Sequence, residues 1–235
     1  MPCDPIDLLC ADLCLADYAY GPGTPATLAA LGGLVMEEEI LGLDGHAGMS
    51  VAVDPFNGLS YCVFHGTEDL WPDGILDVDF MPESCELAPG AIWTDGAARW
   101  FRSLTVRGQP LTSYLAGSPT SSMRFTGHSA GAWLALFAAM SNGAAGVTLL
   151  SPPNALNAAG VAAVKASLWF AASRAYAGQF DIVPDFPKLV WPLPEILQAI
   201  PLRLLSPNLL TPPLSRLALP QHRCANVRAM MAALP

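Results

Sequence analysis

Charged side chains are scarce in this sequence of 235 residues. They make up 13% of it, against 52% hydrophobic residues, and the formal net charge is −9. The negative balance argues against nucleic acid as a partner, because binding to DNA or RNA depends on clustered Lys and Arg. The excess of apolar residues favours a large apolar cavity or an exposed apolar face.

The sequence also lacks the signals of membrane insertion and export. No stretch approaches the roughly 20 uninterrupted apolar residues of a transmembrane helix. The first ten residues, MPCDPIDLLC, have no basic segment ahead of an apolar run, as a signal peptide would. We therefore expect a cytoplasmic protein by default. Because no long linker divides the chain, we also expect a single domain over residues 1–235.

The cysteines show no spacing typical of a metal site. Cys10 and Cys14 are four residues apart on a predicted helix, but the nearest histidine is far along the chain from them, whereas zinc sites bring Cys and His together at short intervals. We expect mostly reduced, buried thiols that pack as small hydrophobic side chains, and no metal. A disulfide from the N-terminal helix is the alternative. The six are Cys3, Cys10, Cys14, Cys62, Cys85 and Cys224.

Apolar patterning predicts an α/β protein. Helical spacing covers an N-terminal segment, 5–34, and the turn sequence DPFNG joins two strands at 49–53 and 59–64. Beyond a helix at 97–104, strands alternate with helices, which predicts a mostly parallel central sheet flanked by helices. The elements expected there are strands at 123–126, 146–150 and 171–177 and helices at 130–140 and 154–168.

One short motif carries the strongest chemical signal. Residues 127–131, GHSAG, fit the pattern G-x-S-x-G. In α/β-hydrolases this pattern forms the nucleophile elbow, a sharp strand-to-helix turn that presents the serine. Glycines are required there because larger side chains would clash in so tight a turn. An apolar strand is predicted before the motif and an uncharged helix after it, so Ser129 is the candidate nucleophile.

A nucleophilic serine needs a base to take its proton and an acid to orient that base. In this fold the chain order is serine, acid, histidine. The sequence has four histidines, and His46, His65 and His128 all precede Ser129, which leaves His222 as the candidate base. A surface histidine in a loop is the alternative reading of His222.

Three acidic residues follow the serine: Asp181, Asp185 and Glu195. We favour Asp181, because it comes after a predicted strand, where α/β enzymes place functional side chains. A turn-capping role for Asp181 is the alternative. The oxyanion of the reaction needs two backbone N–H donors, one from Ala130 and the other from the segment His65-Gly66-Thr67 after an earlier strand.

The chain resembles the class 3 lipase family, which includes fungal-type lipases and feruloyl esterases, over roughly residues 10–225. The similarity lies in FHGT at 64–67, TGHSAGA at 126–132 and DIVPDFP at 181–187. The resemblance implies an α/β-hydrolase fold with a triad of Ser129, Asp181 and His222. It also implies an oxyanion hole from Thr67 and Ala130, and ester hydrolysis without metal or organic cofactor.

Several functions remain open at this point. A lipase or esterase acting on a small-molecule or lipid ester, with transient contact to a lipid interface, is the preferred reading. A feruloyl- or polyester-type esterase, a peptidase or amidase, and a catalytically silent lipid- or partner-binding module are the alternatives. A lid would lie at 68–86, which does not read as a long amphipathic helix, so we expect little interfacial activation. The proline-rich apolar tail, 184–220, would line or cover the acyl pocket, or pack as ordinary core.

Overall fold

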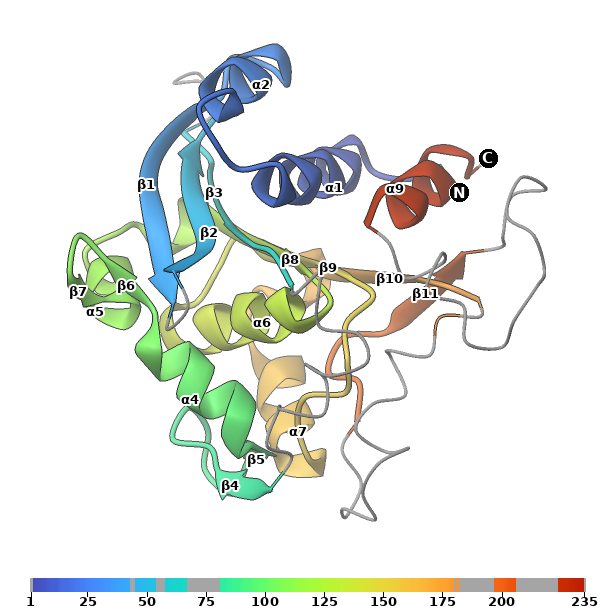
Figure 1. Cartoon of the computed structure of the whole chain (residues 1–235). Helices are drawn as coiled ribbons and strands as arrows, with labels where there is room; N and C mark the ends of the chain where they lie inside the picture. The colour runs from blue at the N-terminus through green and yellow to red at the C-terminus, as the bar shows by residue number, and fades with distance from the viewer. Residues whose placement is uncertain are drawn as a thin grey trace.

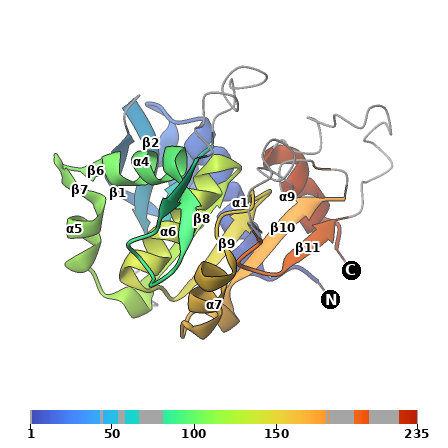
Figure 2. The ribbon, with the colours of Figure 1, turned by 90° about the horizontal axis from the view of Figure 1, so that it is seen from below.

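A computed structural model describes residues 2–42, 45–53, 58–66, 81–179, 181, 197–205 and 224–234. Its centre is a twisted sheet with helices on both faces, as the sequence predicts (Figure 1). On one face lie α1 and α9, which come from opposite ends of the chain and pack side by side (Figures 1 and 2). The other face is covered by α6, with α4 beyond it.

The sheet is parallel on one side and antiparallel on the other. Within the described residues its strand order is β11-β10-β9-β8-β3-β2-β1-β6-β7. Neighbours are parallel from β11 to β3 and antiparallel from β3 to β7. The strands are β1 (Val35–Gly42), β2 (Gly45–Ala52), β3 (Ser60–Phe64), β6 (Thr105–Val106), β7 (Gln109–Pro110), β8 (Met123–His128), β9 (Gly146–Leu150), β10 (Arg174–Gly178) and β11 (Leu202–Leu205); β4 (Pro82–Ser84) and β5 (Ile92–Thr94) form a separate pair.

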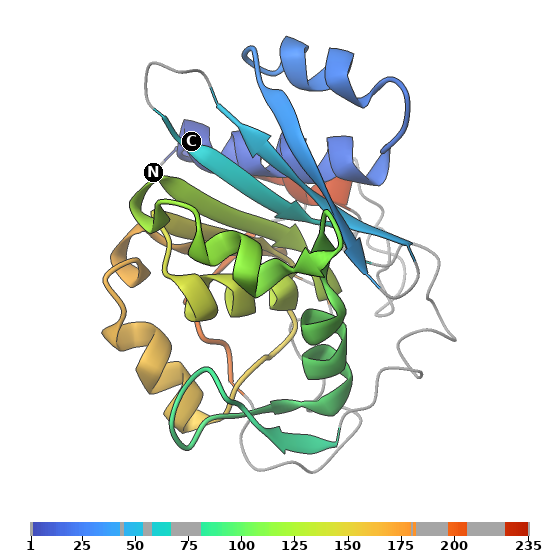
Figure 3. The same cartoon turned by 90° about the vertical axis from the view of Figure 1, so that its left-hand side faces the viewer.

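The helices fill in around this sheet, and Figure 3 shows α2 over the end of β1. None of those described is long and apolar enough to cross a membrane. They are α1 (Pro5–Tyr18), α2 (Thr24–Ala30), α4 (Asp95–Ser103), α5 (Leu111–Ala116), α6 (Ala130–Asn142), α7 (Ala158–Ala166) and α9 (Cys224–Ala232), with 3-10 turns at Thr120–Ser122 and Phe170–Ala172.

Local sequence explains how α1 begins and which face it buries. The Asp4 side chain caps the helix by accepting a hydrogen bond from the Ile6 N–H at 2.9 Å, and Pro5 occupies the first turn, where its missing N–H costs nothing. Cys10, Leu13 and Cys14 are fully buried against the sheet. All six cysteines are buried free thiols, as predicted.

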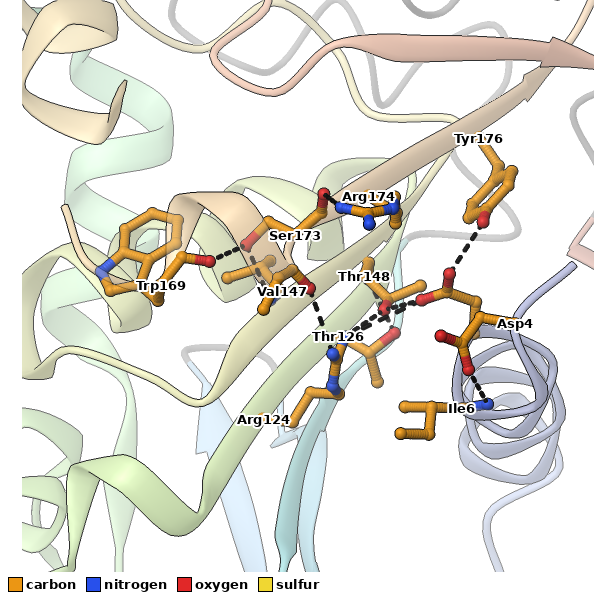
Figure 4. Close-up of polar contacts among 12 residues, drawn as sticks. Asp4, Ile6, Arg124, Thr126, Val147, Thr148, Trp169, Ser173, Arg174 and Tyr176 are labelled. Carbon is orange, nitrogen blue, oxygen red and sulfur yellow. Dashed lines mark hydrogen bonds and ion pairs between the residues drawn. The ribbon is translucent and has the colours of Figure 1, made fainter. Parts of the chain in front are cut away.

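A buried carboxylate ties the first turns of α1 to the sheet. Asp7 accepts hydrogen bonds from Thr148 Oγ1 at 2.6 Å and from the Tyr176 hydroxyl at 2.7 Å. The Arg124 guanidinium lies 3.8 Å from the same carboxylate and donates to Thr148. Figure 4 shows Arg124, Thr148 and Tyr176 converging from β8, β9 and β10. Such a buried charge is tolerated only when its oxygens are paired, so this network fixes α1 in place.

Some predicted elements differ from the structure. Strand β1 was not predicted, because three consecutive glutamates, Glu37–Glu39, interrupt the alternation of apolar and polar residues that is typical of a strand. In the structure Ile40 faces the core, while the neighbouring side chains remain partly exposed. The strand expected at 171–177 begins at Arg174, because residues 170–172 form a 3-10 turn. The helix expected at 154–168 is shorter, since Asn157 caps it and its first residue is Ala158.

The regions predicted as lid and acyl-pocket wall lie mostly outside the described residues. Of the lid segment, residues 81–86 are described and include the short strand β4. Of the tail, residues 197–205 are described. There Ile200 and Leu205 are buried in the core, whereas Leu204 is 59% exposed. The structure therefore supports core packing, and not a pocket wall, for Ile200 and Leu205.

Candidate active site

The G-x-S-x-G motif forms the predicted elbow. Strand β8 ends at His128, α6 begins at Ala130, and Ser129 joins them with φ 56° and ψ −129°. A positive φ is uncommon for a residue other than glycine, and such strain collects at functional sites. The Ser129 N–H donates to the Leu150 carbonyl at 2.9 Å, which anchors the strained residue to the end of β9.

Both glycines of the motif are dictated by close backbone approach. A Cβ on Gly127 would collide with the carbonyl of Gly131, and a Cβ on Gly131 would collide with the carbonyl of Phe64 and lie 2.6 Å from that of His65. These neighbours are backbone atoms that cannot move aside cheaply. The predicted steric reason for the motif is therefore confirmed in atomic terms, and the elbow is pressed against the end of β3.

The N-terminus of α6 faces the site and favours negative charge. The helix, AGAWLALFAAMSN, has no charged residue, and no side chain caps it at Ser129. Its partial positive charge is therefore not offset by an acidic side chain. The backbone N–H of Ala130 belongs to this first turn, where helical N–H groups lack partners within the helix. That is the location predicted for one oxyanion donor.

The segment after β3 packs directly on the elbow. A Cβ on Gly66 would lie 2.6 Å from the His128 carbonyl oxygen and 2.7 Å from the Ser129 Cβ, so only glycine allows this approach. The next residue, Thr67, is the other predicted oxyanion donor and lies outside the described residues. Its neighbour Gly66 does bring the chain to the serine.

A tyrosine that sequence reasoning did not single out joins these two segments. The Tyr18 hydroxyl accepts a hydrogen bond from the Gly66 N–H at 3.0 Å and lies 2.7 Å from His128 Nδ1. Because the oxygen accepts from Gly66, its own proton can be donated to the histidine nitrogen. Tyr18, at the end of α1, thus links the segment after β3 to the elbow. The pattern LADYAYG at 15–21 was the available signal, although nothing in it identifies the partners.

The predicted acid occupies the same edge of the sheet as the serine. Asp181 is buried, 7% exposed, and its N–H donates to the Gly178 carbonyl at 3.0 Å in a turn that follows β10. Ser129 follows β8, and β9 lies between these parallel strands, so both residues stand at the carboxyl ends of the sheet. The alternatives Asp185 and Glu195 lie outside the described residues.

The predicted base, His222, also lies outside the described residues. Helix α9 begins two residues later, at Cys224, and is held on α1 by an ion pair between Arg228 and Asp12 at 2.7 Å. The Cys224 thiol is buried at this junction. The chain on the C-terminal side of His222 is thus anchored beside the helix that carries Tyr18.

A thiol and a hydroxyl pack together at the elbow strand β8 without adding charge. Cys14 Sγ lies 3.6 Å from Thr126 Oγ1, which donates to the Thr148 carbonyl at 2.8 Å. Burial raises the pKa of the Cys14 thiol well above its ordinary value. The thiol is therefore neutral at physiological pH and packs without adding charge behind the serine.

Comparison with solved structures relates this fold to fungal lipases. The lipase–propeptide complex of Rhizomucor miehei, in a deletion mutant, matches 86% of this chain and 66% of its own, with a TM-score of 0.67 and 16% identity. A triacylglycerol lipase from Penicillium expansum matches 88% of this chain and 83% of its own, with a TM-score of 0.62 and 15% identity. Lipase II from Rhizopus niveus matches 77% of this chain and 74% of its own, with a TM-score of 0.60 and 19% identity.

The sequence itself matches no family model and no curated protein. At these identities the structural likeness shows a shared fold. The chain spans 66% and 63% of the length of the Rhizomucor miehei lipase in two structures. The predicted α/β-hydrolase fold and the resemblance to the fungal lipases are thus confirmed at the level of architecture. The catalytic roles of individual residues stay predictions.

Proposed function

We propose that this protein hydrolyses carboxylic esters through an acyl-enzyme formed on Ser129. The observation that carries the proposal is the elbow, where a strained serine stands at the N-terminus of an uncharged helix with Gly66 packed against it. Backbone strain at a residue other than glycine collects at active sites, and here it coincides with the G-x-S-x-G motif.

The reaction proceeds in two steps. His222 takes the proton of the Ser129 hydroxyl as the oxygen attacks the ester carbonyl, and Asp181 orients the imidazole and stabilises its charged form. The N–H groups of Thr67 and Ala130 bind the oxyanion. His222 then returns the proton to the leaving alcohol. Water attacks the acyl-enzyme by the same route and frees Ser129.

The substrate that fits best is an acyl ester, either a small molecule or a lipid met by transient contact with an interface. Two observations support this class. The chain is 52% hydrophobic with 13% charge, and the solved structures of similar fold include a triacylglycerol lipase. The proline-rich tail, 184–220, is the proposed wall of the acyl pocket, apart from Ile200 and Leu205, which pack in the core.

The test is hydrolysis of p-nitrophenyl esters of graded acyl length by the wild type and by Ser129→Ala and His222→Ala. Both variants should lose at least about a thousandfold in kcat while remaining folded. Ser151→Ala is the matched control. Ser151 follows the neighbouring strand β9, is fully buried, and also has a positive φ, 47°. We expect this control to retain wild-type activity.

The alternatives give different results in the same experiment. A wild type that hydrolyses no ester, and in which a fluorophosphonate fails to label Ser129, would be a binding module of the same fold. Faster cleavage of matched amides than of esters would indicate a peptidase or amidase. Full activity in Ser129→Ala would place the reaction elsewhere in the molecule.

A further inference from the structure

Three side chains that lie far apart in the sequence meet beside the elbow. They are Asp17 from the last turn of α1, His46 from β2, and His65 directly after β3. Asp17 Oδ1 lies 2.7 Å from His46 Nε2, and Asp17 Oδ2 lies 3.2 Å from His65 Nδ1. One potential ligand atom from each residue lies within 4.8 Å of the other two. We propose that Asp17, His46 and His65 form a binding site for a divalent transition metal of the zinc class.

The donor set matches the chemistry of such an ion. Imidazole nitrogens and a carboxylate oxygen are preferred zinc ligands, with bonds of about 2.0–2.2 Å, so ligand atoms around a tetrahedral ion are about 3.3 Å apart. The two Asp17 contacts, at 2.7 and 3.2 Å, are already close to this separation. The remaining adjustment falls to the rings. The His65 side chain is 23% exposed, so it has room to turn.

The charge balance of the cluster also favours a cation. Asp17 has a fully buried side chain, and Glu39 from β1 lies nearby, with Oε1 3.5 Å from His46 Nδ1. In the part of the chain that the structure describes, neither carboxylate has an ion pair with Lys or Arg. Asp17 is paired with the two histidines, and Glu39, which is 41% exposed, lies beside His46 and Tyr20. Buried carboxylates are stabilised by pairing or by coordinating a metal.

The surroundings hold His46 in the orientation that a ligand requires. The Tyr20 ring stacks on the imidazole, with centroids 3.8 Å apart and an angle of 12°. His46 Nε2 points at Asp17, and Nδ1 is buried with no hydrogen-bond partner among the described residues, with Glu39 Oε1 3.5 Å away on that side. A carboxylate on this side of a ligating histidine occupies the place of the usual second layer of a zinc site. The histidine side chains are 15% and 23% exposed, which leaves an entry path for the ion.

The position of the site gives it a consequence for the elbow. His65 precedes Gly66, whose N–H is bound by Tyr18, and Asp17 precedes Tyr18. An ion bound to Asp17 and His65 would link the end of α1 to the segment that packs on Ser129. The proposal does not depend on ester hydrolysis, because binding of the ion is measured without substrate.

The experiment is calorimetric titration of the full-length, tag-free protein with Zn²⁺ after treatment with EDTA and its removal. We expect one Zn²⁺ per chain and at least about tenfold weaker binding in His46→Gln and in His65→Gln. Glu38→Gln is the control, because Glu38 is next to Glu39 on β1 but pairs with Arg107. Its affinity should equal that of the wild type. Zn²⁺ at about a hundredfold excess over Kd should raise the Tm of the wild type by roughly 5–10 °C.

The proposal is overturned if the wild type shows no saturable binding, or if His46→Gln binds Zn²⁺ as tightly as the wild type. The cluster would then be a hydrogen-bonded support for the segment after β3. Circular dichroism of each variant verifies folding. If His65→Gln does not fold, His46→Gln decides the matter, because its thermal shift with Zn²⁺ should fall to about half that of the wild type or less, while that of Glu38→Gln is kept.

Discussion

Replacing Tyr18 by phenylalanine removes the single oxygen atom that links Gly66, after β3, to His128 in the elbow. The ring can remain in place, because Phe has the same shape without the hydroxyl. Among the described residues, two hydrogen bonds are lost: the one from the N–H of Gly66, at 3.0 Å, and the one with Nδ1 of His128, at 2.7 Å. Gly66 and His128 are both buried, so water does not readily replace the lost oxygen.

The expected cost follows from these two contacts. Leaving a buried polar group without its partner costs about 1–3 kcal/mol, so Tyr18→Phe should destabilise the fold by about 2–4 kcal/mol. For a chain of this size that lowers Tm by roughly 5–15 °C. Gly66 lies next to the proposed donor Thr67. Loss of one oxyanion donor costs about a hundredfold in kcat, so its displacement should cost about 10- to 100-fold, with KM changed less than about threefold.

The assay is p-nitrophenyl ester hydrolysis well below the Tm of the variant, with thermal unfolding measured in parallel. Tyr114→Phe, in a partly buried tyrosine on α5, is the matched control and should keep the wild-type kcat. An unchanged kcat in Tyr18→Phe, in a protein whose activity depends on Ser129, would refute the positioning role of Tyr18. A wild type without activity would instead count against the proposed hydrolysis.

Three further predictions concern the fold. Gly131→Ala should destabilise by about 3 kcal/mol or more, because the new Cβ would collide with the Phe64 carbonyl; a wild-type urea midpoint would contradict this. Asp7→Ala should cost about 3–5 kcal/mol, since it leaves two buried hydroxyls without their acceptor and the Arg124 guanidinium without its neighbouring carboxylate, and a loss below about 1 kcal/mol in chemical denaturation would show that the network is dispensable. Burial raises the pKa of Cys10 and Cys62 to about 12, so about one thiol in 10,000 is ionised at pH 8, against about one in four when unfolded. Iodoacetamide followed by mass spectrometry should therefore label both far more slowly in the native protein, and equal rates in urea and buffer would disprove their burial.

The sequence-based predictions were accurate where adjacent residues specify an element, and failed where contacts between distant segments define it. Strand β9 was predicted to the residue, and α6 and the elbow nearly so, because an apolar strand, a glycine-flanked serine and an uncharged helix follow one another within one stretch. Strand β1 was missed, because its pairing with β2, rather than its own glutamate-rich sequence, makes it a strand. Helix α9 was missed as well, since its buried face is defined by packing on α1.

The sequence by itself determined the local structure that a few adjacent residues can specify, such as the elbow. From it the motif at 127–131 predicts Ser129 as the nucleophile, and chain order and elimination predict Asp181 and His222 as its partners, because in this fold the order along the chain restricts which residues can reach the serine. The same local logic explains Gly127, whose Cβ would meet the Gly131 carbonyl within the turn. Gly131 is required for a tertiary reason, because its Cβ would meet the carbonyls of Phe64 and His65 at the end of β3.

Only the tertiary structure decided which distant residues meet. Tyr18 binds Gly66 and His128, which are 48 and 110 residues away, and Asp17 lies between two histidines that are 29 and 48 residues further along the chain. A hydrogen bond or an ion site requires atoms within a few ångströms of one another, and such distances arise from the packing of α1 across β3, β8 and β9. Sequence spacing carries no record of that packing, so these contacts could be found only in the folded chain.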